Sequence, residues 1–262
     1  MAAMNLNVGI RGLKLGTNIL DLTVPEALKQ KRKTGISWFD DALGGEGFTP
    51  STSMMLTGGP GCGKTTLILQ LADSIMKQGH IAILNTGEES LYQVRMVAER
   101  LNLKKGFICG QDTMVDDVLA HCEEFRLSEE KREKDPLKRK QIFLLQDSLQ
   151  TLNDGKYKDG GTTGNTPLRC CEILTDYVKE HFGILAFIGQ VNKSGEFAGK
   201  NQIKHAIDVH GQLYFDDDKK SETYGHRLFE ITKNRFGCNG KTYVLKMEKD
   251  GLHEEGSFMK AG

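Results

Sequence analysis

The chain has 262 residues, of which 38% are hydrophobic and 27% charged, which is typical of one large globular domain or of one with a small appendage. Its 35 Lys and Arg balance its 35 Asp and Glu, so any nucleic-acid surface must be local rather than a property of net charge. No apolar stretch approaches the roughly 18 residues of a membrane span and no signal peptide is apparent, which predicts a cytoplasmic protein.

The N-terminal segment has the sequence features of an arm or linker. Residues 1–33 have weak hydrophobic periodicity and end in a basic run of Lys29, Lys31, Arg32 and Lys33, a pattern typical of a linker. We therefore expect an N-terminal arm or linker over residues 1–33 and one globular domain over residues 34–262.

Short apolar runs alternate with helical periods along the domain. Seven runs predict buried strands, at residues 53–57, 81–85, 142–146, 184–188, 209–215, 228–233 and 242–247. Helix-period segments at 67–76, 91–101 and 170–178 lie between the early runs. This order predicts an α/β fold with a mainly parallel sheet flanked by helices and ligands beyond the carboxyl ends of the strands. The last three runs have no helices between them and predict an antiparallel C-terminal extension.

A glycine-rich loop follows the first run. Residues 58–65 read Gly-Gly-Pro-Gly-Cys-Gly-Lys-Thr and fit G-x-x-x-x-G-K-[ST] between strand and helix signals. Such a loop turns backbone N–H groups toward a triphosphate, while the lysine reaches the outer phosphates and the threonine hydroxyl reaches Mg²⁺. The sequence thus predicts ATP and Mg²⁺ binding by Gly58, Gly59, Pro60, Gly61, Cys62, Gly63, Lys64, Thr65 and Thr66.

Carboxylates follow two other runs. The apolar residues 142–145 lead to Asp147, where a metal-coordinating carboxylate is expected, and we assign Thr65 and Asp147 to Mg²⁺. Glu88 and Glu89 follow the run at 81–85. We predict that Glu88 is the general base and that Glu89 supports it; alternatively, one of the two caps the following helix.

Three loops complete the pattern. Gln190 lies just after the 184–188 run. It either senses the γ-phosphate of a bound nucleotide and transmits this signal to residues 191–206, or only forms hydrogen bonds with the neighbouring loop backbone. Residues 151–167 are rich in Gly, Thr and Asp and predict a mobile loop. Residues 128–140 carry mixed charges and predict a solvated helix end and loop.

Several motifs together resemble a known family. They are Thr34-Gly35-Ile36, Asp40, Leu43-Gly44-Gly45, the glycine-rich loop, Gly87-Glu88-Glu89-Ser90, Asp147 to Leu152, and Lys233-Asn234-Arg235-Phe236-Gly237. In this order they resemble the bacterial RadA (Sms) recombination ATPase of the RecA/DnaB/KaiC group, over about residues 34–252. The Lys-Asn-Arg-Phe-Gly string is the most specific. RadA proteins usually begin with a four-cysteine zinc module and end with a Lon-like domain. The six cysteines here form no Cys-x-x-Cys pair, so zinc is not expected, and at 262 residues a Lon-like domain is not expected either. Gln190 also stands where RadA typically has His.

The resemblance implies a RecA-like P-loop core and a DNA-stimulated ATPase that acts in recombination and repair. It implies a ring, with six subunits as the expected number, or a filament, with ATP at each interface. Lys233 and Arg235 would act in trans on the γ-phosphate of the next subunit, as catalytic groups beside Lys64, Glu88 and Gln190. Residues 152–166 and 191–206 would face single-stranded DNA, with phosphate contacts from Lys156, Lys158, Lys193, Lys200 and Lys204.

A second class of function remains open at the level of sequence. A KaiC-like regulatory ATPase, which controls protein partners without nucleic acid, shares the glycine-rich loop, the paired glutamates and the aspartate. The Lys-Asn-Arg-Phe-Gly string and the Gly-rich loop favour the DNA-dependent class.

Overall fold

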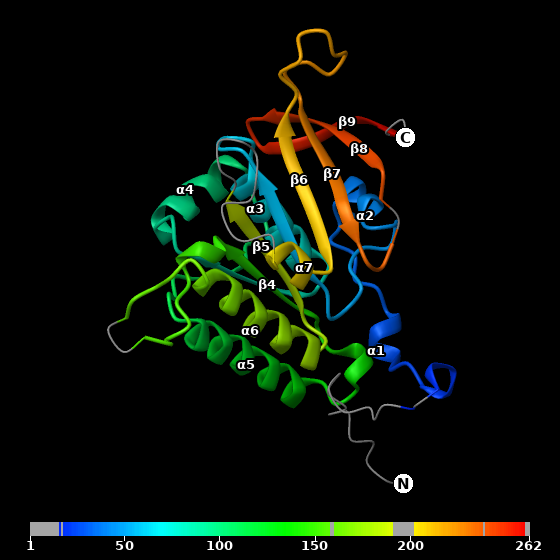
Figure 1. Ribbon diagram of the computed structural model, residues 1–262, viewed down its shortest axis with the longest axis vertical. Coiled ribbons are helices and arrows are strands. Elements are labelled where there is room, and N and C mark those ends of the chain that lie inside the picture. The colour runs from blue at the N-terminus through cyan, green and yellow to red at the C-terminus, as the bar shows by residue number, and fades with distance from the viewer. Residues whose placement is uncertain (1–15, 17, 158–159, 191–201, 238, 260–262) are drawn as a thin grey trace.

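The sheet runs through the middle of the molecule (Figure 1). The structure is a computed structural model that describes residues 16–259 except 17, 158–159, 191–201 and 238. Within these residues the strands form a nine-stranded sheet of order β3-β2-β4-β5-β1-β6-β7-β8-β9. Neighbouring strands from β3 to β6 pair in parallel, and the pairs from β6 to β9 are antiparallel. The predicted α/β fold with an antiparallel extension is confirmed.

The seven predicted strands are all present. They are β1 (Ser53–Gly58), β2 (Ile81–Thr86), β4 (Ile142–Asp147), β5 (Ile184–Gln190), β6 (Val209–Phe215), β7 (Arg227–Asn234) and β8 (Lys241–Glu248). The sequence did not predict β3 (Ile108–Gly110) or β9 (Gly251–Met259). The first is only three residues long, and the second is an edge strand whose residues after Leu252 are mostly exposed, so neither presents a continuous apolar run.

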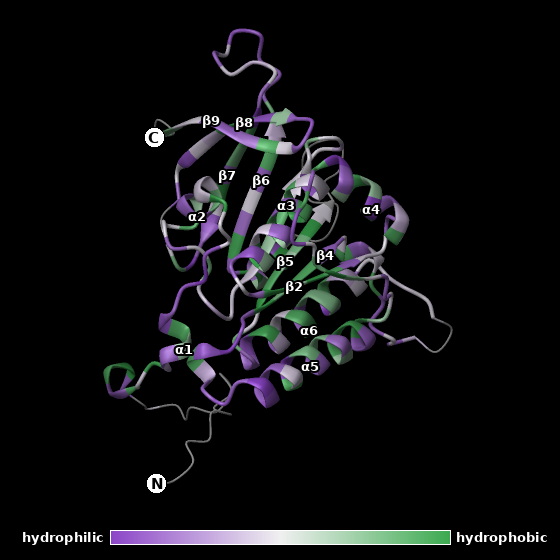
Figure 2. Cartoon of the chain, turned by 180° about the vertical axis from the view of Figure 1, so that it is seen from behind, coloured by the Kyte–Doolittle hydropathy of each residue, from purple (hydrophilic) through white to green (hydrophobic). Residues whose placement is uncertain are grey.

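Helices cover both faces of the sheet. One core cluster lies under α2 (Ser37–Ala42), α3 (Lys64–Lys77) and α4 (Leu91–Arg100). The other lies under α5 (Val115–Arg132), α6 (Thr166–Glu180) and α7 (Gln202–Ala206). Figure 2 shows the hydrophobic residues concentrated on the central strands and on the helix faces that meet them. The periodicity predicted α3, α4 and α6 but missed α5, because few of its 18 residues are buried.

The N-terminal segment joins the core before residue 34. After η1 (Ile19–Asp21) and α1 (Glu26–Lys29), the backbone of Arg32 exchanges two hydrogen bonds with that of Phe48, 2.7 and 2.8 Å long. Upstream, Ile19 and Leu20 are 73% and 88% exposed. A boundary at residue 33 therefore stays a prediction. Among the described residues, every helix is too short or too polar to span a bilayer.

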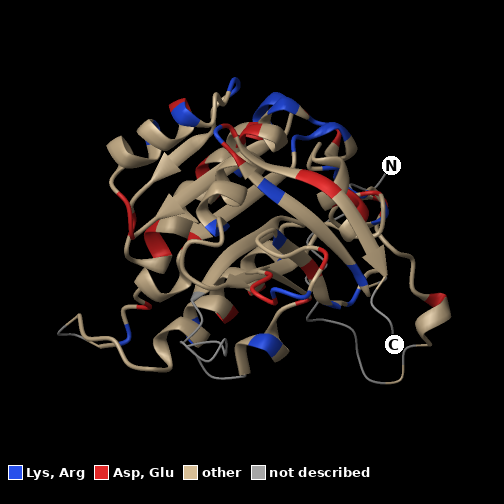
Figure 3. Ribbon diagram, turned by 90° about the horizontal axis from the view of Figure 1, so that it is seen from above, with Lys and Arg blue, Asp and Glu red and all other residues tan. Residues whose placement is uncertain are grey.

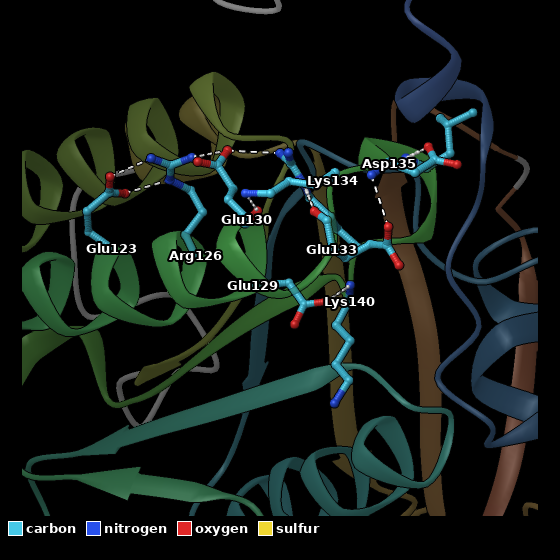
Figure 4. A network of polar contacts seen from close by, with 10 residues as sticks. Glu123, Arg126, Glu129, Glu130, Glu133, Lys134, Asp135 and Lys140 are labelled. Atoms are coloured by element: carbon cyan, nitrogen blue, oxygen red, sulfur yellow. Dashed lines mark hydrogen bonds and ion pairs between the residues drawn. The ribbon is translucent and has the colours of Figure 1, made fainter.

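The charged segment at 128–140 folds back on itself (Figure 4). As expected, it forms the end of α5 and a loop with one short turn, η2 (Pro136–Lys138). Glu129 departs from that expectation because it is only 6% exposed. Its carboxylate accepts hydrogen bonds from the Arg132 side chain and, at 2.7 Å, from the backbone N–H of Lys140. Elsewhere, Lys and Arg are interspersed with Asp and Glu (Figure 3).

Candidate nucleotide-binding site

The glycine-rich loop connects β1 to α3 at the carboxyl edge of the parallel strands. Gly63, with φ of 108°, precedes the first helical residue, Lys64. Gly58 is required for packing, since a Cβ at this position would lie 2.0 Å from the carbonyl oxygen of Leu213 on β6. The N-terminus of a helix beside such a loop is suited to bind phosphate.

The C-terminal strands hold this loop from outside. Arg227, at the start of β7, donates from Nε to the Cys62 carbonyl at 2.9 Å. Leu252, at the start of β9, donates its backbone N–H to Gln70 of α3 at 2.9 Å. A Cβ at Gly63 would lie 2.7 Å from the methyl group of Met247 on β8. The antiparallel extension thus buttresses the loop, which the sequence did not indicate.

Lys64 and Thr65 lie where a magnesium-bound triphosphate would need them. The Lys64 ammonium donates to the carbonyls of Gly58 and Gly59 at 2.9 and 3.0 Å. The Thr65 hydroxyl donates to Asp147 Oδ2 at 2.9 Å. A hydroxyl and a carboxylate in contact offer the hard oxygen ligands that Mg²⁺ prefers, so the residues present fit the predicted metal site.

Asp147 lies in an acidic setting that a cation would relieve. Asp147 is 4% exposed. Burial, together with the nearby Glu88 and Glu89, raises its pKa to about 6, and the hydrogen bond from Thr65 opposes this rise. Burial and like charges both disfavour the ionised carboxyl. A bound divalent cation would oppose both effects at this point.

The two glutamates differ in their contacts. Glu88 Oε1 accepts a hydrogen bond from Ser148 Oγ, the residue after Asp147. Glu89 Oε2 is buried without a hydrogen-bond partner among the described residues. Neither glutamate caps α4, because Ser90 and Gln93 form a reciprocal capping box there. The alternative reading of the pair as a helix cap is therefore wrong.

Gln190 shares the same edge. It is the last residue of β5 and lies in register with Gly58 of β1. Its side chain lies outside the described residues, so its two predicted roles stay open.

Lys233 and Arg235 lie at the other end of the sheet. Strand register aligns Lys233 with His210, and His210 with Met55. Arg235 contacts Asp208, which itself contacts Ser53, the first residue of β1. The five steps along the strand from Ser53 to Gly58 span about 16 Å, and the three steps from Met55 to Gly58 span about 10 Å. This pair therefore lies far from the phosphate loop of its own subunit.

Both cations contact their own chain rather than projecting freely. Lys233 Nζ donates to the carbonyls of Lys204 and Ile207 at 2.7 and 2.6 Å. Burial, followed by the neighbouring Arg235, lowers the pKa of Lys233. Arg235 donates to the carbonyl of His205 at 3.2 Å. Cations commonly satisfy the open carbonyls at a helix C-terminus, and here they do so for α7.

The predicted DNA-facing loops begin near the nucleotide site. One follows β4 and η3 (Leu149–Thr151), and the other follows β5. Lys156 is exposed and Lys204 is half-buried on α7, whereas Lys158, Lys193 and Lys200 lie outside the described residues. Arg169 pairs with Asp154 and lies 5.9 Å from the centre of the Tyr157 ring. Local contacts therefore anchor the first loop.

Comparisons with known proteins agree with this geometry. The family model described as "ATPase: KaiC" matches residues 32–142. The DNA repair protein RadA of Brucella abortus is 29% identical over 222 residues, which are 84% of this chain and 44% of that protein. The chain is therefore similar to ATPase cores of the RadA and KaiC type.

Two solved structures share the fold. A KaiC-like protein of Pyrococcus horikoshii has a TM-score of 0.65 at 19% identity, covering 86% of this chain and 99% of that one. The second structure, described as an ATPase domain, has a TM-score of 0.69 at 16% identity, with coverages of 87% and 93%. The predicted RecA-like fold and the resemblance to RadA are confirmed, and the match to an ATPase family model agrees with the predicted ATPase class. The chain spans about half the length of the curated relatives it matches.

Proposed function

We propose that the protein is an ATP-dependent motor or recombinase of the RadA type, which acts on single-stranded DNA in recombination and repair by branch migration or strand exchange. The observation that supports ATP hydrolysis is the hydrogen bond from Thr65 to Asp147, which lies next to the carboxylates of Glu88 and Glu89. The relatives named DNA repair protein RadA support the DNA part.

Each residue at the loop has a role in this proposal. Lys64 and the backbone N–H groups of residues 58–66, Pro60 excepted, bind the phosphates, and Thr65 and Asp147 would hold Mg²⁺. Mg²⁺ would neutralise charge on the β- and γ-phosphates. Glu88, oriented by Ser148, accepts a proton from the attacking water as the water oxygen bonds to the γ-phosphorus and the bond to ADP breaks.

Lys233 and Arg235 complete the site of the neighbouring subunit. Because about 16 Å of sheet separates Arg235 from its own loop, and about 10 Å separates Lys233, a role in catalysis requires another copy. Contacts in which one edge of a subunit meets the opposite edge of the next are head-to-tail, and such contacts generate rings or filaments. We therefore propose a ring, a hexamer by expectation, or a filament with ATP between subunits.

A regulatory ATPase is the second candidate, because the family model that matches this chain is of the KaiC type. ATP hydrolysis measured with and without single-stranded DNA separates the two. We expect stimulation by DNA, and loss of hydrolysis in Lys64→Ala, whose missing ammonium leaves phosphate charge uncompensated. Equal rates with and without DNA, and no DNA binding at low salt with a non-hydrolysable nucleotide, would favour the regulatory class.

Mixed oligomers test the trans cations. Lys64→Ala subunits have a dead site but an intact cation pair, and Arg235→Ala subunits have the reverse. We expect each variant alone to be inactive and the mixture to recover part of the activity, since such a cation contributes about 10³- to 10⁵-fold in rate. No recovery in assembled mixtures would show that Arg235 does not act on the neighbour.

A further inference from the structure

Asp208 is a buried carboxylate that the proposed reaction does not yet use. It directly precedes β6, and its side chain is 2% exposed. Its Oδ2 accepts hydrogen bonds from both the backbone N–H and the hydroxyl of Ser53, each 3.0 Å long. One oxygen of the carboxylate is thereby fixed to the first residue of β1, in the middle of the sheet.

The other oxygen of Asp208 faces cations. Oδ1 lies 3.2 Å from Arg235 Nη1 and 3.8 Å from Lys179 Nζ of α6. The backbone N–H of Arg235 also donates to the Asp208 carbonyl at 3.1 Å. Arg235 is therefore held to one residue by both its backbone and its guanidinium.

The exposed part of Arg235 suggests what this arrangement does. Its side chain is 49% exposed, although its carboxylate partner is buried. Ion pairs with a solvent-exposed member contribute little to stability. A guanidinium on a flexible chain nevertheless gains orientation from a fixed carboxylate, because fewer torsions stay free. Asp208 thus orients Arg235 while part of the side chain remains accessible.

We propose that Asp208 is a positioning residue for Arg235, holding the guanidinium so that its accessible part meets the γ-phosphate of the next subunit. This inference rests on the trans role of Arg235 in the proposed function. Lys179 and Lys233 lie near the same carboxylate, so the anchor sits within a group of cations suited to an incoming phosphate. Asp208 itself does not touch the nucleotide.

Asp208→Asn in mixed oligomers tests the proposal, because a positioning defect affects only the neighbour's site. A Lys64→Ala/Asp208→Asn subunit supplies only its cations to an Arg235→Ala partner. We expect it to restore less than about one tenth of the activity that Lys64→Ala restores, since a misplacement of about 1 Å can cost on the order of 10²-fold. The loss should appear in kcat rather than in KM, because the nucleotide-binding loop is intact.

The reverse mixture controls for folding. An Asp208→Asn subunit that receives cations from a Lys64→Ala partner should hydrolyse ATP as well as an Arg235→Ala subunit does in the same mixture. Asp73→Asn is the matched variant. Asp73 of α3 is 1% exposed, pairs with Lys77 at 2.6 Å and accepts hydrogen bonds from the backbone N–H groups of Lys105 and Gly106. Placed in the Lys64→Ala donor, it should leave recovery unchanged.

The outcomes separate the inference from the proposed function. Full recovery with the Asp208→Asn donor would overturn the positioning role of Asp208 while leaving the trans cation in place. Failure of Asp208→Asn both as donor and as recipient would show a structural role instead. Absence of recovery in the original Lys64→Ala and Arg235→Ala mixture would overturn the trans assignment, and this inference with it.

Discussion

At the scale of single residues, Glu88 and Glu89 are distinguished by their partners. Glu88 is exposed and is hydrogen-bonded by Ser148, whereas Glu89 is half-buried. We expect Glu88→Gln to keep nucleotide affinity and to slow hydrolysis by about 10²-fold or more, because only proton transfer in the transition state is lost. Single-turnover hydrolysis and nucleotide titration measure the two effects. Glu89→Gln is the matched variant, and a stronger defect there would reverse the assignment.

His210 links three strands inside the sheet. Its ring nitrogens lie 2.8 Å from Thr57 Oγ1 on β1 and 2.5 Å from Thr232 Oγ1 on β7. Burial, with Lys204 and Lys233 nearby, lowers its pKa to about 4 from 6.5. The folded protein therefore binds fewer protons than the unfolded chain between these values. Stability is lost as the pH falls through this window.

This pKa shift gives a measurable pH dependence. When the pH falls from 7 to 5, His210 becomes protonated in the unfolded chain but stays largely neutral in the folded protein. We expect this difference to lower the free energy of unfolding by about 2 kcal/mol. Urea unfolding of the wild type and of His210→Gln at both pH values measures it. The variant should be less stable at pH 7 but should lose less stability on acidification. Equal losses in the two proteins would contradict the shift.

At the scale of elements, the end of α5 depends on one carboxylate. Glu129 satisfies the backbone N–H of Lys140, which returns the chain to β4, and pairs with Arg132. We expect Glu129→Ala to lower the free energy of unfolding by about 1.5–3 kcal/mol, because it removes hydrogen bonds to a charged group. Glu124→Ala, at an exposed position of the same helix, should change it by less than about 0.5 kcal/mol. Equal effects in urea unfolding would show that Glu129 does not fix this turn.

At the scale of the whole molecule, the proposed active site combines the phosphate loop of one subunit with Arg235 of the next, two parts that lie at opposite edges of each subunit's sheet. The phosphate loop lies at the carboxyl edge of the parallel strands, and Arg235 contacts residues at the amino edge. A single subunit therefore has an incomplete site in the proposed mechanism. Catalysis and assembly would then depend on each other.

The DNA-facing loops give a prediction for the assembled protein. If several lysines contact phosphates, the logarithm of affinity for single-stranded DNA should fall with log salt by about 0.7 per neutralised phosphate. Replacing Lys156, Lys158, Lys193 and Lys200 together by Ala should flatten this slope and leave DNA-independent hydrolysis largely unchanged. Replacing Lys131, Lys134, Lys138 and Lys140, near the amino end of β4, is the control. An unchanged slope in the first variant would exclude these loops as the DNA contact.

The sequence by itself determined the parts of the site that are local. Residues 58–65 form the phosphate loop because the glycines and the flanking patterns lie next to one another in the chain. The position of Asp147 followed from an apolar strand of known direction. The seven apolar runs predicted seven strands for the same reason, whereas the exposed β9 and the polar α5 gave too weak a signal.

Only the tertiary structure decided which distant residues meet. Ser148 and Glu88 are 60 positions apart, and Arg235 and Asp208 are 27 apart. Such contacts exist only once the order and register of the strands are set, and no single-sequence period encodes that order. The same holds for the hairpin of β8 and β9 that packs against the phosphate loop. A contiguous motif is fixed by backbone geometry over a few residues, whereas these partners are fixed by the sheet as a whole.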